Sequence, residues 1–189
     1  MLANLRVLLG VFVDIILLRR GPEHLPASRA LLAVLVVLHI VAYACAYLVF
    51  LAALMHLGAA AIWLGNLFSA VLLLLWFRVA LQLAGKPERF VQTMIAVFFV
   101  SLLGVVLVPM VAALFPYTFA AQPDPAGTPP VALMLFSDVL SLWILAMFTR
   151  VVKSAFEWSW LGSIGFVALS LIGVPLLFAL LLGGGSGAS

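Results

Sequence analysis

Residues 90–114 read FVQTMIAVFFVSLLGVVLVPMVAAL and contain no charged side chain. One bilayer crossing needs about 20 mostly apolar residues, so this stretch is long enough to span a membrane as a helix. Four more apolar stretches, at about 30–54, 58–82, 131–150 and 159–182, have comparable length. A helix satisfies its own backbone hydrogen bonds in lipid. The sequence therefore predicts an all-α, polytopic membrane helix bundle with five transmembrane helices.

The composition supports this fold class. The chain has 189 residues, of which 67% are hydrophobic and 8% are charged, and its mean hydropathy is +1.36. A soluble domain has about half apolar and about a quarter charged residues. The pI near 9.5 does not indicate nucleic-acid binding, because the basic residues flank apolar stretches and form no basic run. We expect membrane lipid, and no nucleic acid, as a partner.

Three regions are predicted along the chain: an N-terminal region (1–29), the transmembrane domain (30–182) and a flexible tail (183–189). Residues 4–20 are apolar but short, and Arg6, Gly10 and Asp14 follow one another at helical spacing. This narrow polar stripe predicts a short amphipathic helix that lies in the membrane interface. GPEHLPAS then interrupts the helix, and Ser28 is a candidate N-cap for the next one.

The distribution of Lys and Arg predicts the topology. With the N-terminus inside and a chain break near Gly58 between the first two spans, all nine basic residues fall on the inner side. Without that break, 30–82 would be one run far longer than a bilayer needs. The positive-inside rule then places the N-terminus in the cytoplasm and the C-terminus outside. The basic residues concerned are Arg6, Arg19, Arg20, Arg29, Arg78, Lys86, Arg89, Arg150 and Lys153.

The layout resembles the Yip family. A short amphipathic helix comes first, LLRRGPEHLPASRALL follows at 17–32, and GKPERFVQT at 85–93 opens the third of five spans. Eukaryotic Yip proteins are five-span proteins that associate with Rab GTPases through a cytosolic part carrying a DLYGP-like motif. This chain has no such motif, and its N-terminal region is too short for a cytosolic domain. The resemblance therefore implies the bacterial branch, an inner-membrane location and a non-enzymatic role, without Rab binding.

One polar residue recurs at similar depth in every predicted span: His39, Asn66, Ser101, Asp138 and Ser170. Two readings are open. The layer is either a proton, ion or head-group path, or a hydrogen-bonded core that fixes how the helices pack.

Asp138 is the most informative member of this layer, because an ionised carboxylate facing lipid is expensive. At about 1.5 Å per residue it lies about 10 Å below the outer boundary. We expect it to face the bundle interior and to pair with Asn66 or His39.

Small residues also predict close packing. Ala61, Gly65 and Ser69 recur at helical spacing and form a candidate seam, either within the chain or between two copies. Pro109 predicts a kink in the third span, since it removes a backbone donor.

The sequence contains no recognisable catalytic, metal-binding or cofactor-binding motif, so we expect neither an enzyme nor a cofactor. The histidines have no HxxxH or HExxH spacing, and Cys45 is a lone cysteine within an apolar run. Two function classes remain. The first is a scaffold or membrane-organising protein that binds other membrane proteins, lipid or a second copy. The second is a small transporter or channel subunit that works through the polar layer around Asp138.

Overall fold

A computed structural model describes residues 2–52, 58–118 and 130–183, and these residues contain helices and no strand. The side chains of residues 2–5, 115–116, 118 and 174–183 are outside the description. The helices, in chain order, are α1 (Leu2–Ile16), η1 (Pro22–His24), α2 (Arg29–Phe50), α4 (Ala59–Leu83), η2 (Pro87–Arg89), α5 (Phe90–Gly104), α6 (Leu107–Thr118), α7 (Val131–Phe156) and α8 (Trp160–Gly183).

Four of these segments are long and apolar enough to cross a membrane: Arg29–Phe50, Ala59–Leu83, Pro87–Leu114 and Val131–Phe156. The predicted class, an all-helical integral membrane protein, is therefore confirmed at this level. The fifth predicted span corresponds to α8, whose fully described part, Trp160–Gly173, is shorter than a crossing needs. The five-span count thus stays a prediction.

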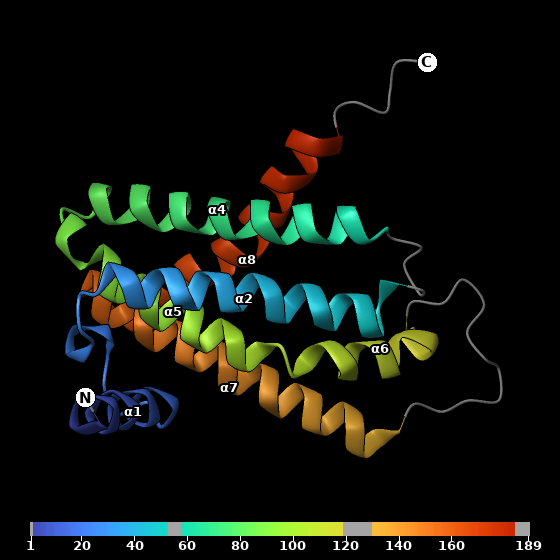
Figure 1. Cartoon of the computed structure of the whole chain (residues 1–189), viewed down its shortest axis with the longest axis horizontal. Coiled ribbons are helices and arrows are strands. Elements are labelled where there is room, and N and C mark those ends of the chain that lie inside the picture. Colours follow the sequence, from blue (N-terminus) through green and yellow to red (C-terminus); the bar gives the residue numbers. More distant parts are fainter. Residues whose placement is uncertain (1, 53–57, 119–129, 184–189) are drawn as a thin grey trace.

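α2, α4, α5–α6 and α7 lie side by side, and successive spans run in opposite directions (Figure 1). α8 leaves the same end as the α7 C-terminus and crosses the bundle obliquely against α7 and α4. The break predicted near Gly58 is confirmed, because α2 ends at Phe50 and α4 begins at Ala59. Residues 53–57 at that junction, most of the proline-rich loop and the tail after Gly183 lie outside the described residues.

α5 is the central helix and packs against α2, α4, α7, η1 and α1. Every residue from Thr93 to Phe98 is buried, so this part of α5 is covered on all sides. Its one polar side chain there is satisfied, because Thr93 Oγ1 donates to the Arg89 carbonyl at 2.8 Å. The core of the protein is therefore built around the third predicted span.

α1 lies across one end of the bundle, roughly perpendicular to the long helices (Figure 1). Val11, Phe12 and Ile15 are buried, and the Phe12 ring stacks on Phe99 of α5 at a centroid distance of 4.0 Å. The helix ends at Ile16, earlier than the predicted residue 20. The end is fixed by a turn in which Arg19 N bonds the Asp14 carbonyl.

Two local predictions are confirmed. Ser28 caps α2, since its side chain accepts a 3.2 Å hydrogen bond from Leu31 N. Pro109 lies just after a break in the third span, where α5 ends at Gly104 and α6 begins at Leu107. The intervening amides form shorter-range bonds, such as Val105 N to the Leu102 carbonyl at 3.2 Å.

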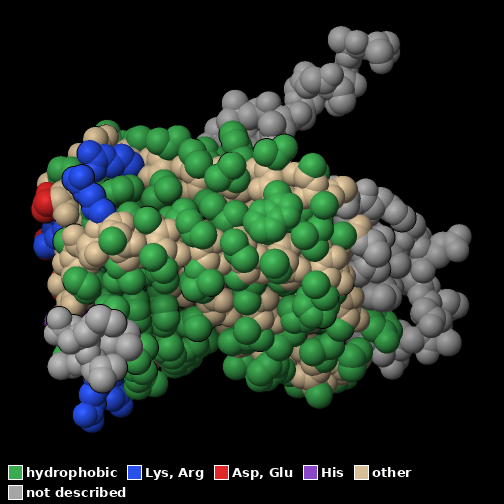
Figure 2. Space-filling model, in the orientation of Figure 1, with side chains coloured by type: hydrophobic (Ala, Val, Ile, Leu, Met, Phe, Trp, Pro, Cys, Tyr) green, Lys and Arg blue, Asp and Glu red, His purple; other side chains and the backbone are tan. Residues whose placement is uncertain are grey.

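Among the described residues, the charged side chains other than Asp138 are gathered at one end of the molecule. In the view of Figure 2, the Lys, Arg, Asp and Glu side chains lie at the end that holds α1 and the α4–α5 turn, and hydrophobic side chains cover the rest. α7 extends beyond the predicted residue 150 to Phe156, so Arg150 and Lys153 project from its last turns at this charged end.

Candidate functional site

His39 and Ser101, two members of the predicted polar layer, lie together between α2 and α5. Ser101 Oγ is 3.2 Å from His39 Nδ1. Tyr43, one turn further along α2, donates through Oη to the Ser101 backbone carbonyl at 2.9 Å. This carbonyl needs a donor, because Val105 N bonds Leu102 at the helix break instead. The cluster therefore satisfies polar groups that the break in α5–α6 releases.

Ser170 and Asn66 form separate contacts. Ser170 Oγ on α8 accepts a 2.9 Å hydrogen bond from Trp76 Nε1 on α4, and it donates to a carbonyl of its own helix. Asn66 Nδ2 donates to the Ile62 carbonyl one turn back at 2.8 Å. The predicted layer is thus divided into local contacts and does not form one continuous network.

Asp138 does not face the bundle interior, so the prediction that it pairs there with Asn66 or His39 is wrong. Its side chain is exposed, while Asn66 and His39 bond other groups. The rotation of α7 is set by its bulky apolar side chains, such as Ile144 and Met147, which are buried. At 3.6 residues per turn, position 138 lies about 120° around the helix from Ile144. The carboxylate therefore projects away from the core.

The small-residue seam also lies on the surface. Ala61 and Ser69 are exposed and Gly65 is half-buried. The described part of the chain therefore does not use the seam for its own packing, and its use between two copies stays a prediction.

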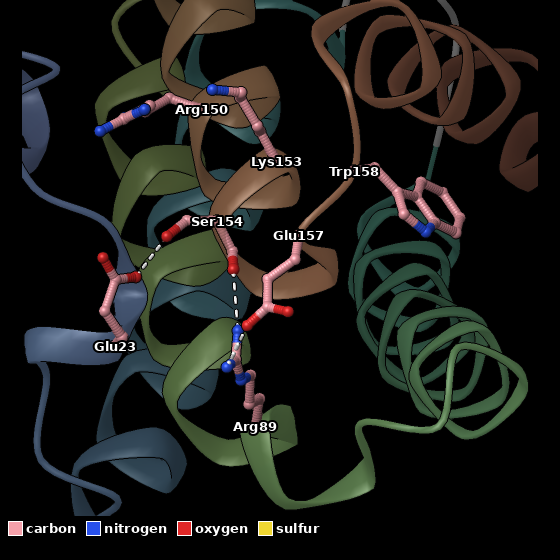
Figure 3. A pocket seen from close by; sticks show the side chains of 7 residues that line it. All are labelled: Glu23, Arg89, Arg150, Lys153, Ser154, Glu157 and Trp158. Carbon is pink, nitrogen blue, oxygen red and sulfur yellow. Dashed lines mark hydrogen bonds and ion pairs between the residues drawn. The ribbon is translucent and has the colours of Figure 1, made fainter.

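A pocket at the charged end gathers residues that were not predicted as a site. Its volume is about 410 Å³, and it lies where η1, the start of α5, the end of α7 and the α7–α8 turn meet (Figure 3). We call it the basic pocket. The lining residues are Glu23, Arg89, Arg150, Lys153, Ser154, Glu157 and Trp158.

One side of the basic pocket is a structural ion-pair cluster. Arg89 donates to the Ser154 and Ala155 carbonyls at 3.1 and 3.4 Å and to Glu157 Oε1 at 2.5 Å. Lys86 Nζ contacts the other oxygen of Glu157. Hydrogen bonds from Lys86 and Arg89 lower the pKa of the Glu157 carboxyl. Arg89 thus binds otherwise unpaired carbonyls at the C-terminus of α7 and joins that end to α5.

The opposite side is the contact between η1 and α7. Ser154 Oγ donates to Glu23 Oε2, and Gly21 packs so tightly on this serine that a Cβ there would lie 2.6 Å from Ser154 Cβ. Burial raises the pKa of the Glu23 carboxyl, but the Ser154 hydrogen bond, a backbone hydrogen bond and the charges of His24 and Arg150 lower it overall. Glu23 is therefore ionised at neutral pH and already has a donor.

Two cations of the pocket are not used by these contacts. Arg150 Nε is buried and has no hydrogen-bond partner among the described residues. Lys153 Nζ lies over the Trp160 ring, 4.9 Å from its centroid. In Figure 3 both side chains project from α7 on the side away from the Arg89–Glu157 pair. A guanidinium and an ammonium group thus line the pocket without a carboxylate partner within 4 Å among the described residues, and such groups can bind an anion.

The arrangement suits binding better than catalysis. Glu23 contacts both Ser154 and His24. Its Oε2 accepts from Ser154 Oγ, and its Oε1 lies 3.4 Å from His24 Nδ1. The carboxylate lies between hydroxyl and imidazole, so the histidine does not contact the serine proton as a catalytic base would. Among the described residues, no group of three or more His, Cys, Asp or Glu side chains is placed to hold a metal ion.

In the sequence pattern, Arg89, Arg150 and Lys153 indicate topology and are not marked as a site. The sequence did indicate that the turn before the third span and the end of the fourth span lie on the same side of the membrane. Which of those ends meet depends on α5 and α7 being neighbours, and this follows from packing that the sequence pattern does not specify.

Comparison of this chain with protein-family models, with curated proteins and with solved structures found no match. The resemblance to the Yip family accordingly stays an expectation from the sequence.

Proposed function

We propose that this chain is a non-enzymatic, Yip-like membrane protein that organises membrane components by holding an anionic group in the basic pocket. One observation carries the proposal: Arg150 and Lys153 line the same open pocket, and neither has a carboxylate partner within 4 Å among the described residues. Guanidinium and ammonium groups in that setting bind phosphate or carboxylate oxygens through charge-assisted hydrogen bonds. The acidic side chains of the pocket are already bonded to Ser154, Lys86 and Arg89.

The proposal includes the orientation of the chain in a bacterial inner membrane. The segregation of Lys and Arg supports five spans with the basic pocket and the N-terminus in the cytoplasm. The position of α1 across the charged end, with Arg6 and Gly10 exposed and Asp14 half-buried, supports an in-plane amphipathic helix. A reporter fused after Ser189 should be active only outside the cytoplasm. Cytoplasmic activity would contradict this topology.

Anion binding is tested by the thermal stability of the purified full chain in a non-ionic detergent. Inorganic phosphate should raise the unfolding temperature above that in chloride of equal ionic strength, because a ligand of the folded state stabilises it. Arg150→Gln should lose most of this rise. Arg19→Gln removes the same charge from an exposed position outside the pocket and should keep it. Equal effects of phosphate and chloride on the unaltered chain would refute the proposal.

Transport is the second candidate, and one observation favours it. The third span is broken beside His39, Ser101 and Tyr43, and broken helices with polar groups near mid-membrane occur in transporters. Asp138 is exposed, so this path would use His39 in its place. Reconstituted vesicles provide the test. A proton flux that His39→Gln abolishes would favour transport, and absence of flux in the unaltered protein would exclude proton transport.

A further inference from the structure

We propose that the anion in the basic pocket is the phosphate of an anionic glycerophospholipid, and that one acyl chain of the same molecule lies in a groove between α7 and α8. This inference rests on the proposed anion binding and adds the chemical class of the ligand. Its evidence is an apolar cavity that begins where the basic pocket ends.

The cavity has a volume of about 330 Å³ and is lined by apolar stripes from two neighbouring helices. α7 contributes Leu142, Ala146 and Thr149, and α8 contributes Trp160, Ile164 and Ala168. The polar group of this set is not free, since Thr149 Oγ1 donates to the carbonyl one turn back at 2.9 Å. We call this cavity the α7–α8 groove, and its surface is suited to hydrocarbon.

The two cavities adjoin through Lys153 and Trp160. Lys153 lines the basic pocket, Trp160 lines the groove, and the ammonium group lies 4.9 Å from the centre of the indole ring. Thr149 and Lys153 are one turn apart on α7, so the stripe that lines the groove ends in a cation. From the groove toward the basic pocket, the order is therefore apolar side chains, the aromatic ring of α8 and the positive charge of α7, which matches acyl chain, interface and head group.

The dimensions fit one leaflet. From Trp160 to Leu171 the groove follows α8 for about 16 Å at 1.5 Å per residue, and half of a hydrocarbon core is about 15 Å. Leu142 and Ile164 expose 65% and 50% of their surfaces, so the groove is open from the side. A chain that enters from the bilayer would cover these side chains without leaving its own leaflet.

Charge complementarity selects an anionic lipid over a zwitterionic one. Basic pockets between membrane helices bind anionic head groups, and each Lys or Arg near the surface contributes about fivefold in affinity. Lys153 and Arg150 have no carboxylate partner within 4 Å in the described structure, whereas Glu157 already contacts two cations. The carboxylates therefore offer no free site for the positive group of a zwitterionic head.

The test uses the full chain, stripped of lipid in detergent, with native mass spectrometry to count retained lipid. Phosphatidylglycerol should be retained at least about fivefold better than phosphatidylcholine with the same chains. Ala168→Phe fills the groove and should lower phosphatidylglycerol retention about fivefold or more, while inorganic phosphate still stabilises the protein. Ala33→Phe makes the same change on the exposed surface of α2 and should leave retention unchanged.

The outcomes separate this inference from the proposed function. Stabilisation by phosphate with equal retention of both lipids, or with undiminished retention in Ala168→Phe, would overturn the lipid assignment and leave the anion site intact. A chain that phosphate does not stabilise would overturn both.

A second measurement covers the case in which Ala168→Phe does not fold. Stoichiometric phosphatidylglycerol with brominated chains should quench the tryptophan fluorescence of the unaltered protein. Trp160→Phe should remove most of that quenching, and quenching that is the same without Trp160 would contradict the groove.

Discussion

Gly104, the last residue of α5, allows a direct test of the polar cluster at the helix break. A Cβ at this position would lie 2.9 Å from Tyr43 Oη, a distance that real Cβ atoms essentially never show. In Gly104→Ala the Tyr43 ring must therefore move. The hydroxyl is at the far end of the side chain, so the movement is easy, but it breaks the 2.9 Å bond to the Ser101 carbonyl.

The size of the effect follows from what that carbonyl loses. Val105 N bonds Leu102, so the helix itself offers Ser101 no replacement donor. A buried acceptor left without a partner costs about 1–3 kcal/mol. Alanine is better than glycine in a helix by about 0.5–1 kcal/mol, which offsets part of the loss. We expect Gly104→Ala to lower the free energy of unfolding by about 1 kcal/mol.

The assay is unfolding by SDS in mixed micelles, followed by helical circular dichroism. Tyr43→Phe removes the same hydrogen bond without the clash, and the two changes together should cost less than the sum of the single effects. A Gly104→Ala protein that is as stable as the unaltered chain, or a double variant whose effects simply add, would refute the reasoning.

Three further predictions concern the charged end. Gly21→Ala should separate η1 from Ser154 and lower the free energy of unfolding by about 1–3 kcal/mol. Hydrogen exchange over residues 22–27 should become faster, and unchanged exchange would contradict the prediction. Phe12→Ala should cost about 3 kcal/mol by removing the stack on Phe99, and exchange should rise in α1 but not in α5. The carboxyl of Glu23 has a lowered pKa in the folded protein. Its contribution to stability is therefore complete at a pH above the ordinary carboxyl pKa of about 4.3, and it is lost as the pH falls through the lower folded-state pKa. Glu23→Gln should flatten that acid limb of the thermal stability, and an unchanged limb would exclude the role.

The sequence predicted those features that depend on local composition. Helices appeared where apolar runs were long, Ser28 capped α2, and the helix broke just before Pro109. The five long apolar stretches predicted one span more than the four that the described helices support. The fifth depends on a part of α8 whose side chains are not described.

The sequence did not predict which way a helix faces or which ends meet. Asp138 was expected inside because a carboxylate in lipid is costly, yet the packing of Ile144 and Met147 determines the rotation of α7. Similarly, Arg150 and Arg89 became members of one pocket only because α5 and α7 are neighbours. Cost arguments for a single residue fail when many apolar side chains decide the orientation together.

The central position of α5 has a consequence for how the protein assembles during synthesis. α5 leaves the ribosome before α7, so its α7-facing side first contacts lipid tails, which suit apolar side chains as well as a helix does. Arg89 instead bonds the carbonyls of Ser154 and Ala155 and the carboxylate of Glu157, which are all made later than α5. The turn before α5 therefore forms its final hydrogen bonds only when the α7 C-terminus has been made. The N-terminal end of the third span is completed later than its middle.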